Sequence, residues 1–193
     1  MKNKKVQLLA EAAIMLALAI VLSFIRIWNM PMGGSVTLLS MLPIMLFSVK
    51  NGVVKGIGTA FVFSLFQLVQ AIAEGNVFPY CTTLGIIILC VLFDYVVPFT
   101  VLGLCSVTKN INFGKLKNLG LYIGIAGVCV LRFICHYTTG VVIWGQWAEG
   151  MSKEVYSLLY NGQYMLPEMI LTVIAAAILL NAKAIRKLLG LTN

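Results

Sequence analysis

Four ionisable side chains stand inside long apolar runs of this sequence: Asp94, Arg132, His136 and Glu168. A charged group in hydrocarbon is costly, so such residues usually face a cavity or the interior of a helix bundle. Asp94 offers a carboxylate that attracts a cation, and His136, the only histidine, offers an imidazole. Arg132 has a simpler interpretation, because it can form an interior ion pair with Asp94 or Glu168.

His136 belongs to a regularly spaced set. Gly140 and Trp144 follow it at intervals of four residues, which keeps side chains on one face of a helix. The rise from His136 to Trp144 is roughly 12 Å in an α-helix, and Gly140 leaves a gap between them. Taken alone, His136 fits a hydrogen bond between helices better than a ligand contact. The spacing shifts that balance towards a surface that holds a flat molecule with two rings between an imidazole and an indole.

The chain that carries these residues has the composition of an integral membrane protein. Of its 193 residues, 61% are hydrophobic and 10% charged, and the mean hydropathy is +0.99. A soluble domain carries about 25% charged residues, so this chain has too few to cover a surface that faces water. The net charge of +8 comes from lysines that flank apolar runs. It is not a basic patch interleaved with aromatic residues, which argues against nucleic-acid binding.

The apolar runs predict an all-α protein with six transmembrane helices, over residues 6–27, 36–49, 53–73, 84–107, 119–147 and 155–182. Five of these runs are long enough for a span of roughly 20 residues, whereas 36–49 is shorter. With 36–49 left out, the chain would cross the membrane five times. The distribution of positive charge decides between the two counts.

With six spans, every lysine-rich segment falls on one side of the membrane, which the positive-inside rule makes cytoplasmic. These segments contain Lys2, Lys4, Lys5, Lys50, Lys55, Lys109, Lys115, Lys117, Lys183, Arg186 and Lys187. Five spans would break the pattern. We therefore expect both termini to be cytoplasmic and residues 1–193 to form a single transmembrane domain.

This topology places polar groups from three helices at a similar depth. Asp94 lies about ten residues, or roughly 15 Å, below the outer surface. His136 lies at a comparable depth, and Asn161 lies somewhat higher. Pro98 and Pro167 each remove a backbone hydrogen bond nearby, and irregular backbone inside a membrane is tolerated where it lines a cavity. The convergence predicts a ligand pocket open to the outside.

Other kinds of site find little support. The five cysteines are scattered without a CxxC pair and are interpreted as small core residues, so no metal site is expected. The segment NGVVKGIG lacks the Gly-Lys-Ser/Thr of a nucleotide-binding loop. An intramembrane enzyme is disfavoured, because no second histidine, metal set or nucleophile motif accompanies His136 and Asp94.

Small residues at four-residue spacing let helix backbones approach closely in lipid. Such pairs include Ala13 with Ala17, Gly52 with Gly56, and Gly120 with Gly124. Packing within the protein is the favoured interpretation, and a docking face for another subunit is the alternative.

Several segments resemble the thiamine-specific S component of energy-coupling factor (ECF) vitamin transporters. They are HYTTGVVIWGQWAEG (136–150), VYSLLYNGQY (155–164), FDYVVP (93–98) and LLAEAAIMLALAIVLS (8–23). The resemblance implies a six-helix protein of the bacterial cell membrane with cytoplasmic termini, which captures the vitamin from outside. It also implies partners: a transmembrane coupling subunit and two ABC ATPase subunits that drive uptake with ATP.

The resemblance also carries site residues. The family's ligand contacts fall on Asp94, Tyr95, His136, Gly140, Trp144, Tyr156 and Asn161, and its docking motif falls on Ala13 and Ala17. The acidic position, a glutamate in some relatives, is an aspartate here. Thiamine joins a cationic thiazolium ring to an aminopyrimidine, and this chemistry suits a carboxylate in a low-dielectric pocket, a tryptophan face and directional hydrogen-bonding groups.

Two alternatives of the transport class stay open from the sequence. The chain could be an S component for another vitamin or for a thiamine precursor. It could instead be a stand-alone ion-coupled carrier that uses Arg132 and Glu168. No enzymatic activity is expected.

Overall fold

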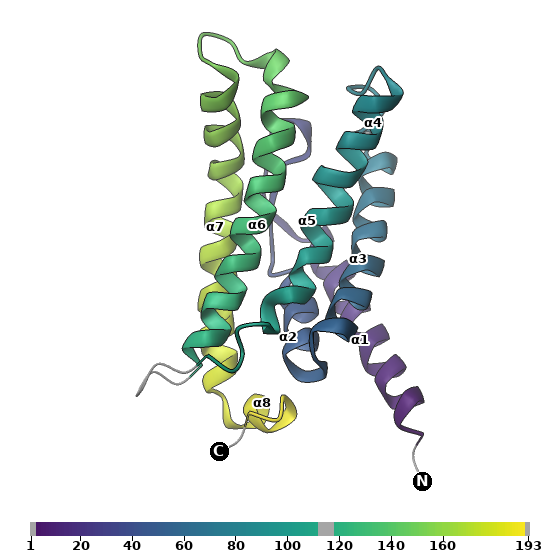
Figure 1. Cartoon of the computed structure of the whole chain (residues 1–193), viewed down its shortest axis with the longest axis vertical. Helices are drawn as coiled ribbons and strands as arrows, with labels where there is room; N and C mark the ends of the chain where they lie inside the picture. The colour runs from purple at the N-terminus through teal and green to yellow at the C-terminus, as the bar shows by residue number, and fades with distance from the viewer. Residues whose placement is uncertain (1–2, 112–117, 192–193) are drawn as a thin grey trace.

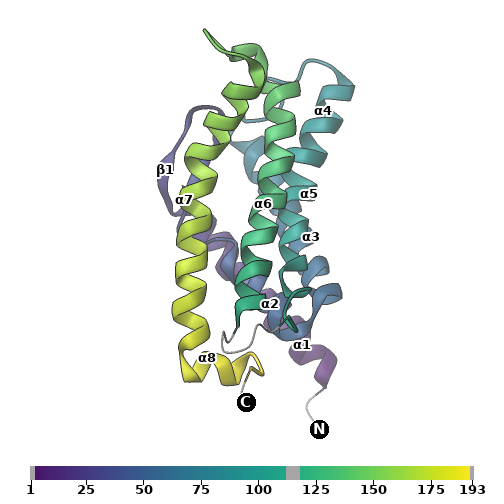
Figure 2. The same cartoon turned by 60° about the vertical axis from the view of Figure 1, so that its left-hand side comes forward.

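The long apolar runs form the helices of a bundle, seen from two directions in Figures 1 and 2. The structure, a computed structural model, describes residues 3–111 and 118–191; Lys2, Lys115 and Lys117 of the predicted basic segments lie outside them. Five helical segments are long and apolar enough to cross a membrane: Lys4–Phe24 (α1), Val53–Ala73 (α3), Leu84–Ser106, Leu119–Val142 (α6) and Lys153–Asn181 (α7). The all-α membrane class is confirmed, and the number six stays a prediction.

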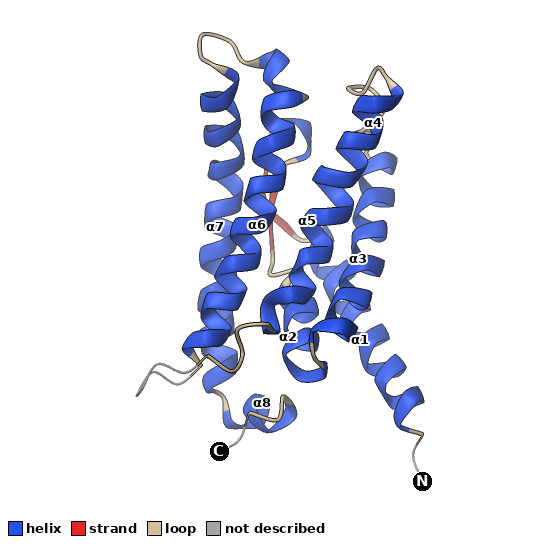
Figure 3. Ribbon diagram, in the orientation of Figure 1, coloured by secondary structure: helices blue, strands red, loops and turns tan. Residues whose placement is uncertain are grey.

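The second predicted helix, 36–49, differs from what the structure shows. Arg26–Asn29 (β1) and Ser35–Thr37 (β2) form an antiparallel hairpin around the 3-10 turn Pro31–Gly33 (η1), and a helix begins only at Leu42. Met32 and Gly33 both have positive φ, and Met30 N–H donates to Gly34 O at 2.7 Å, which closes the turn. Figure 3 shows the strands level with the middle of α6.

Helix α2, Leu42–Asn51, follows the hairpin and is packed inside the bundle near the end that carries the termini (Figure 1). Eight of its ten residues are buried. At 1.5 Å per residue it is only about 15 Å long, about half the hydrocarbon thickness of a bilayer. Residues 36–41, which the sequence assigned to this helix, instead form the end of β2 and the turn that leads into α2.

The fourth apolar run is helical but irregular. It consists of Leu84–Cys90 (α4), the π-helical turn Val91–Val96 (η2), Val97–Thr100 (α5) and the 3-10 segment Val101–Ser106 (η3). Pro98 has no N–H to donate to Asp94 O, and Val97 N–H donates to Leu92 O, five residues back. The wide turn carries Asp94, whose side chain is buried inside the bundle.

Helices α6 and α7 pack side by side along most of their length (Figures 1 and 2). Helix α6 ends at Val142, earlier than the predicted 147, and Trp144–Trp147 form a separate 3-10 turn (η4). Helix α7 continues through Pro167 without a break. A short helix, Lys183–Leu188 (α8), follows it, and both chain termini lie at the same end of the bundle (Figure 1).

Glycines allow close helix contacts at the end that carries the termini. A Cβ on Gly56 would clash with Ser48. A Cβ on Gly124 would clash with a backbone carbonyl in η3, and one on Gly120 would clash with carbonyls of the chain just after η3. These small residues pack within the protein. Ala13 and Ala17, by contrast, are exposed on the outer surface of α1.

Candidate functional site

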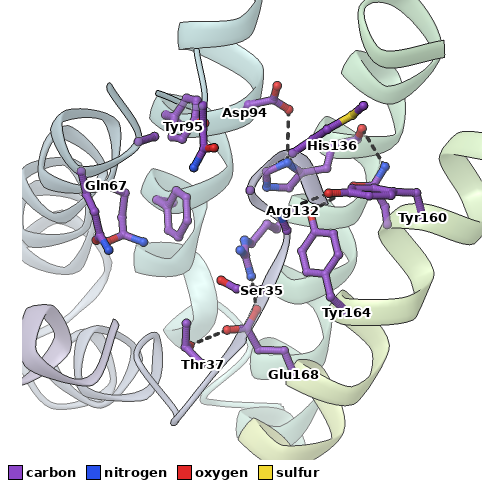
Figure 4. A pocket seen from close by; sticks show the side chains of 18 of the residues that line it. Ser35, Thr37, Gln67, Asp94, Tyr95, Arg132, His136, Tyr160, Tyr164 and Glu168 are labelled. Carbon is purple, nitrogen blue, oxygen red and sulfur yellow. Dashed lines mark hydrogen bonds and ion pairs between the residues drawn. The ribbon is translucent and has the colours of Figure 1, made fainter. Parts of the chain in front are cut away.

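One cavity brings together all seven residues predicted as ligand contacts. It lies between the hairpin, α3, η2, α6 and α7, and its lining includes Asp94, Tyr95, His136, Gly140, Trp144, Tyr156 and Asn161. Three helical segments far apart in the sequence thus converge, as the sequence had suggested from depth alone. Figure 4 shows part of this lining from close by.

Asp94 is the centre of the hydrogen-bond network in the cavity wall. Its Oδ1 accepts from the Thr139 hydroxyl and lies 3.2 Å from His136 Nδ1 (Figure 4). Its Oδ2 accepts from Trp144 Nε1 at 3.0 Å. Three donors from α6 and η4 therefore fix one carboxylate that is only 5% exposed. Thr139 was not predicted, although it follows His136 by three residues and so lies on a neighbouring part of the same face.

The bond to Asp94 determines which nitrogen of His136 carries a proton. A carboxylate only accepts hydrogen bonds, so Nδ1 must be the donor. In the neutral imidazole, Nε2 is then an acceptor. This atom is buried and has no hydrogen-bond partner among the described residues, and His136 lines the cavity. His136 therefore has one unused acceptor beside the cavity.

The charged side chains that line the cavity leave one negative charge without a cationic partner. Their described members are three carboxylates and two guanidinium groups: Glu74, Asp94, Glu168, Arg26 and Arg132. Arg26 pairs with Glu74, and Arg132 Nη1 lies 2.7 Å from Glu168 Oε2. Of the two partners considered for Arg132, the structure selects Glu168. With a neutral His136, Asp94 gives this lining a net charge of −1.

Two other aromatic rings pack against Trp144. The Tyr80 ring centroid lies 5.4 Å from that of Trp144, and the Trp147 centroid lies 5.7 Å from it. Tyr80 and Trp147 also contact each other edge to face. Trp144 lies beyond the end of α6, so its position depends on these contacts and on its bond to Asp94 rather than on helical spacing alone.

A row of tyrosines on α7 connects the cavity to the hairpin. Tyr156 and Tyr160 stack with centroids 5.9 Å apart, and Tyr164 lies edge to face with Tyr160. The Tyr160 hydroxyl donates to Pro31 O and accepts from Gly34 N–H. The hairpin thus rests on α7 over one side of the cavity. The spacing of four residues places these tyrosines on one face of the helix, a pattern that the sequence analysis did not take into account.

Asn161 and Gly140, which both line the cavity, also make contacts within the protein. Asn161 Nδ2 donates to His136 O and to Ser157, and its Oδ1 accepts from Tyr164 OH at 3.0 Å. The amide therefore has only acceptor capacity on Oδ1 left for a ligand. The space that Gly140 leaves is filled by Ser157 Oγ, which a Cβ would strike. Gly140 permits close packing of α6 and α7 rather than a gap.

The cavity also includes residues that no local sequence pattern would select. Gln67 and Gln70 enter it from α3, and Thr37 enters from the hairpin. Thr37 Oγ1 donates to Glu168 Oε1 at 2.6 Å. These residues come from segments whose place opposite α6 and α7 depends on tertiary packing, which no local pattern shows.

Comparison with known proteins gives consistent matches over nearly the whole chain. A family model described as "Thiamine transporter protein" matches residues 9–188. The chain is 32% identical over 188 residues to "Thiamine transporter ThiT" of Bacillus subtilis, with 92% of each chain covered. It is 27% identical over 192 residues to the protein of the same name from Lacticaseibacillus paracasei, with 93% of this chain and 89% of that one covered.

The fold also has a counterpart among solved structures. ThiT from Listeria monocytogenes matches with a TM-score of 0.73 and 24% sequence identity, covering 97% of this chain and 99% of that one. This match shows a shared fold along the whole chain.

Proposed function

The chain belongs to the thiamine transporter protein family, and from this membership we propose that it is the thiamine-binding S component of an ECF-type transporter. It is a multi-pass protein of the bacterial cell membrane, and membership of a transporter family indicates a protein that is not an enzyme. In this proposal it captures thiamine from outside, and partner subunits drive uptake with ATP.

The charge of the cavity is the observation that best supports thiamine as the ligand. Thiamine carries one positive charge on its thiazolium ring, and Asp94 gives the cavity lining one negative charge that no cationic side chain among the described residues offsets. In a site of low dielectric, this attraction is larger than it would be in water. A neutral or anionic vitamin would leave the charge of Asp94 unbalanced.

Polar groups in the cavity suit the rest of the molecule. We assign to His136 Nε2 the role of accepting a hydrogen bond from the exocyclic amine of the pyrimidine, since this buried nitrogen has no described partner. Trp144 offers an aromatic face, which can contribute about 0.5–2 kcal/mol to cation binding. Tyr95, Tyr156 and Asn161 line the same cavity and complete the proposed contact set with Gly140.

We also propose that residues 1–193 form one transmembrane substrate-binding domain with six membrane crossings and cytoplasmic termini. The common end of the two termini and the flanking lysines support this orientation (Figure 1). Ala13 and Ala17 are exposed on α1 and are available to a transmembrane coupling subunit. The two ATPase subunits would supply the nucleotide chemistry.

Calorimetry on the purified chain in detergent tests the ligand. We expect saturable binding of thiamine with quenching of tryptophan fluorescence, and weaker binding of the analogue whose exocyclic amine is replaced by a carbonyl oxygen. The carbonyl cannot donate to His136 Nε2 and would face its lone pair. Absence of binding at micromolar thiamine would refute the proposal, and tighter binding of another vitamin in the same assay would replace thiamine as the ligand.

Reconstitution in liposomes tests the partners separately. We expect ATP-dependent thiamine uptake only when the chain is combined with a coupling subunit and two ATPases. Uptake by the chain alone in an ion gradient would instead favour an ion-coupled carrier.

A further inference from the structure

The outer face of α7 carries one polar side chain among aliphatic ones. Gln163 is exposed on this face, and its neighbours Leu159, Leu166 and Ile170 are each about half exposed. Gln163 lies four residues, or about 6 Å, from the middle of this 29-residue helix. It is therefore well inside the hydrocarbon region of a bilayer, which is about 30 Å thick. A polar group that faces lipid at this depth is costly unless it has a hydrogen-bond partner.

Gln163 has more hydrogen-bonding capacity than its own helix uses. Its side-chain amide has two N–H donors and one oxygen. Its backbone oxygen is also freed, because Pro167 has no N–H to donate to it. Thr138 on α6 shows how an exposed polar group can be satisfied locally, since its hydroxyl donates to Ile134 O at 2.9 Å. No bond of this kind is formed by the Gln163 amide among the described residues.

The groups at Gln163 are complementary to themselves. Two N–H donors and two oxygens stand at one point of the helix, so an identical residue on another chain supplies the matching set. All copies of this protein enter the membrane in the same orientation, so two α7 helices that meet are parallel. A two-fold axis along the membrane normal then places Gln163 of one copy opposite Gln163 of the other. Side-chain amides are known to join helices across such contacts in membranes.

The spacing of the exposed residues also fits a parallel pair of helices. Leu159, Gln163, Leu166 and Ile170 are separated by four, three and four residues, which are the d, a, d and a positions of a heptad repeat. Leucine at d with isoleucine at a favours two parallel strands, and a single polar residue at a fixes their register. We propose that the outer face of α7 is a dimerisation surface, that its occupant is α7 of a second copy of this chain, and that Gln163 pairs the two copies.

This surface is separate from the other surfaces assigned to the protein. The buried residues of α7, such as Ser157, Asn161 and Tyr164, lie on the side of the helix that faces the bundle and the cavity. Figures 1 and 2 show α7 and α1 on opposite sides of the bundle. A dimer through α7 therefore leaves Ala13 and Ala17 on α1 exposed, and each copy keeps a complete cavity.

Förster transfer between copies in liposomes tests the association. Chains that carry a donor or an acceptor dye at the C-terminus are reconstituted together, and we expect transfer that falls as lipid is added, as mass action requires. Gln163→Leu should weaken the association about 3- to 30-fold, the effect of losing a polar contact between membrane helices. Thr138→Val is the matched control and should leave the affinity unchanged, because the Thr138 hydroxyl already has a partner. Thermal unfolding in detergent verifies that both variants are folded.

Cross-linking in the same liposomes identifies the face. With copper phenanthroline as the oxidant and the unaltered chain as the baseline, Leu166→Cys should form a disulfide-linked dimer, whereas Leu131→Cys, which is exposed on α6, should not.

Three outcomes would overturn the proposal. The first is a monomeric unaltered chain at every protein density. The second is an equal association of Gln163→Leu and the unaltered chain, or cross-linking at residue 131 rather than 166. The third is a monomeric unaltered chain whose ATP-driven uptake is lost in Gln163→Leu, which would assign this face to the coupling subunit instead of a second copy.

Discussion

Among the described residues that line the cavity, Asp94 carries the one charge that lacks a cationic partner, and replacement by asparagine removes it. The carboxylate is 5% exposed and accepts from four side chains, those of Cys90, His136, Thr139 and Trp144. A carboxylate about 5 Å from a monovalent cation contributes about 3 kcal/mol at an effective dielectric constant of 20. We therefore expect Asp94→Asn to weaken thiamine binding by about two orders of magnitude.

The same substitution also changes the hydrogen bonds, and this effect must be separated from charge. An amide has one oxygen, so it cannot accept at both of the positions where the carboxylate does, and one of the donors loses its partner. Loss of such a partner costs about 1–3 kcal/mol whatever the ligand charge. The affinity for the free hydroxymethyl-aminopyrimidine half of thiamine, which has no thiazolium cation, reports this second effect alone.

Titration calorimetry separates the effect of charge from the effect of the lost hydrogen bond. Both ligands are titrated into the unaltered chain, Asp94→Asn and Asp94→Glu. We expect Asp94→Asn to affect thiamine at least tenfold more than the neutral pyrimidine. Asp94→Glu keeps the charge and should stay within about tenfold of the unaltered chain. Equal losses for thiamine and the pyrimidine in Asp94→Asn, with the fold intact by thermal unfolding, would refute the assignment of charge compensation to Asp94.

Three further substitutions test the surroundings of the site. Gly140→Ala forces a Cβ into α7 and should destabilise the protein by about 1–3 kcal/mol, whereas Gly127→Ala in the same helix, where nothing lies within 4 Å, should not lower the melting temperature in detergent. Glu168→Gln leaves Arg132 buried without its partner and should destabilise by about 3–5 kcal/mol; a double change of both residues to apolar ones that is no more stable than Glu168→Gln would contradict this reason. Trp144→Phe keeps a ring but removes the N–H that binds the site carboxylate, so thiamine affinity should fall about tenfold, and an unchanged dissociation constant would show that this bond is unimportant.

The sequence predicted the parts of the molecule that depend on composition and local spacing. Apolar runs gave the membrane class, and the depth of Asp94 and His136 correctly placed them in one cavity. These features follow from hydropathy and helical rise alone. The proline at 98 indicated irregular backbone near Asp94, and the structure has a π-helical turn there.

The parts that the sequence did not predict depend on contacts between distant segments. The apolar residues of 36–49 fit a helix. In the structure, however, Thr37 donates a hydrogen bond to Glu168, and the turn at Met32–Gly33 connects β1 to β2, which pair with each other. Gly140 looked like a gap for a ligand, and Ser157 from the neighbouring helix fills it. Gln67 gave no signal, because its position opposite α6 is set by packing.

The glycine contacts make one end of the bundle tightly packed, whereas the rest of the bundle contains the cavity. Gly56, Gly120 and Gly124 bring backbones together at the end with the termini, where side chains have no room to rearrange. The cavity is lined in part by the hairpin, which two hydrogen bonds of the Tyr160 hydroxyl hold to α7. We expect amide hydrogen exchange to slow near the cavity on ligand binding and to stay unchanged at the glycine contacts. A partner that docks at the terminal end would then meet the same surface with or without ligand. Coupling between ligand binding and docking would therefore depend on helices that reach both halves, such as α1 and α7.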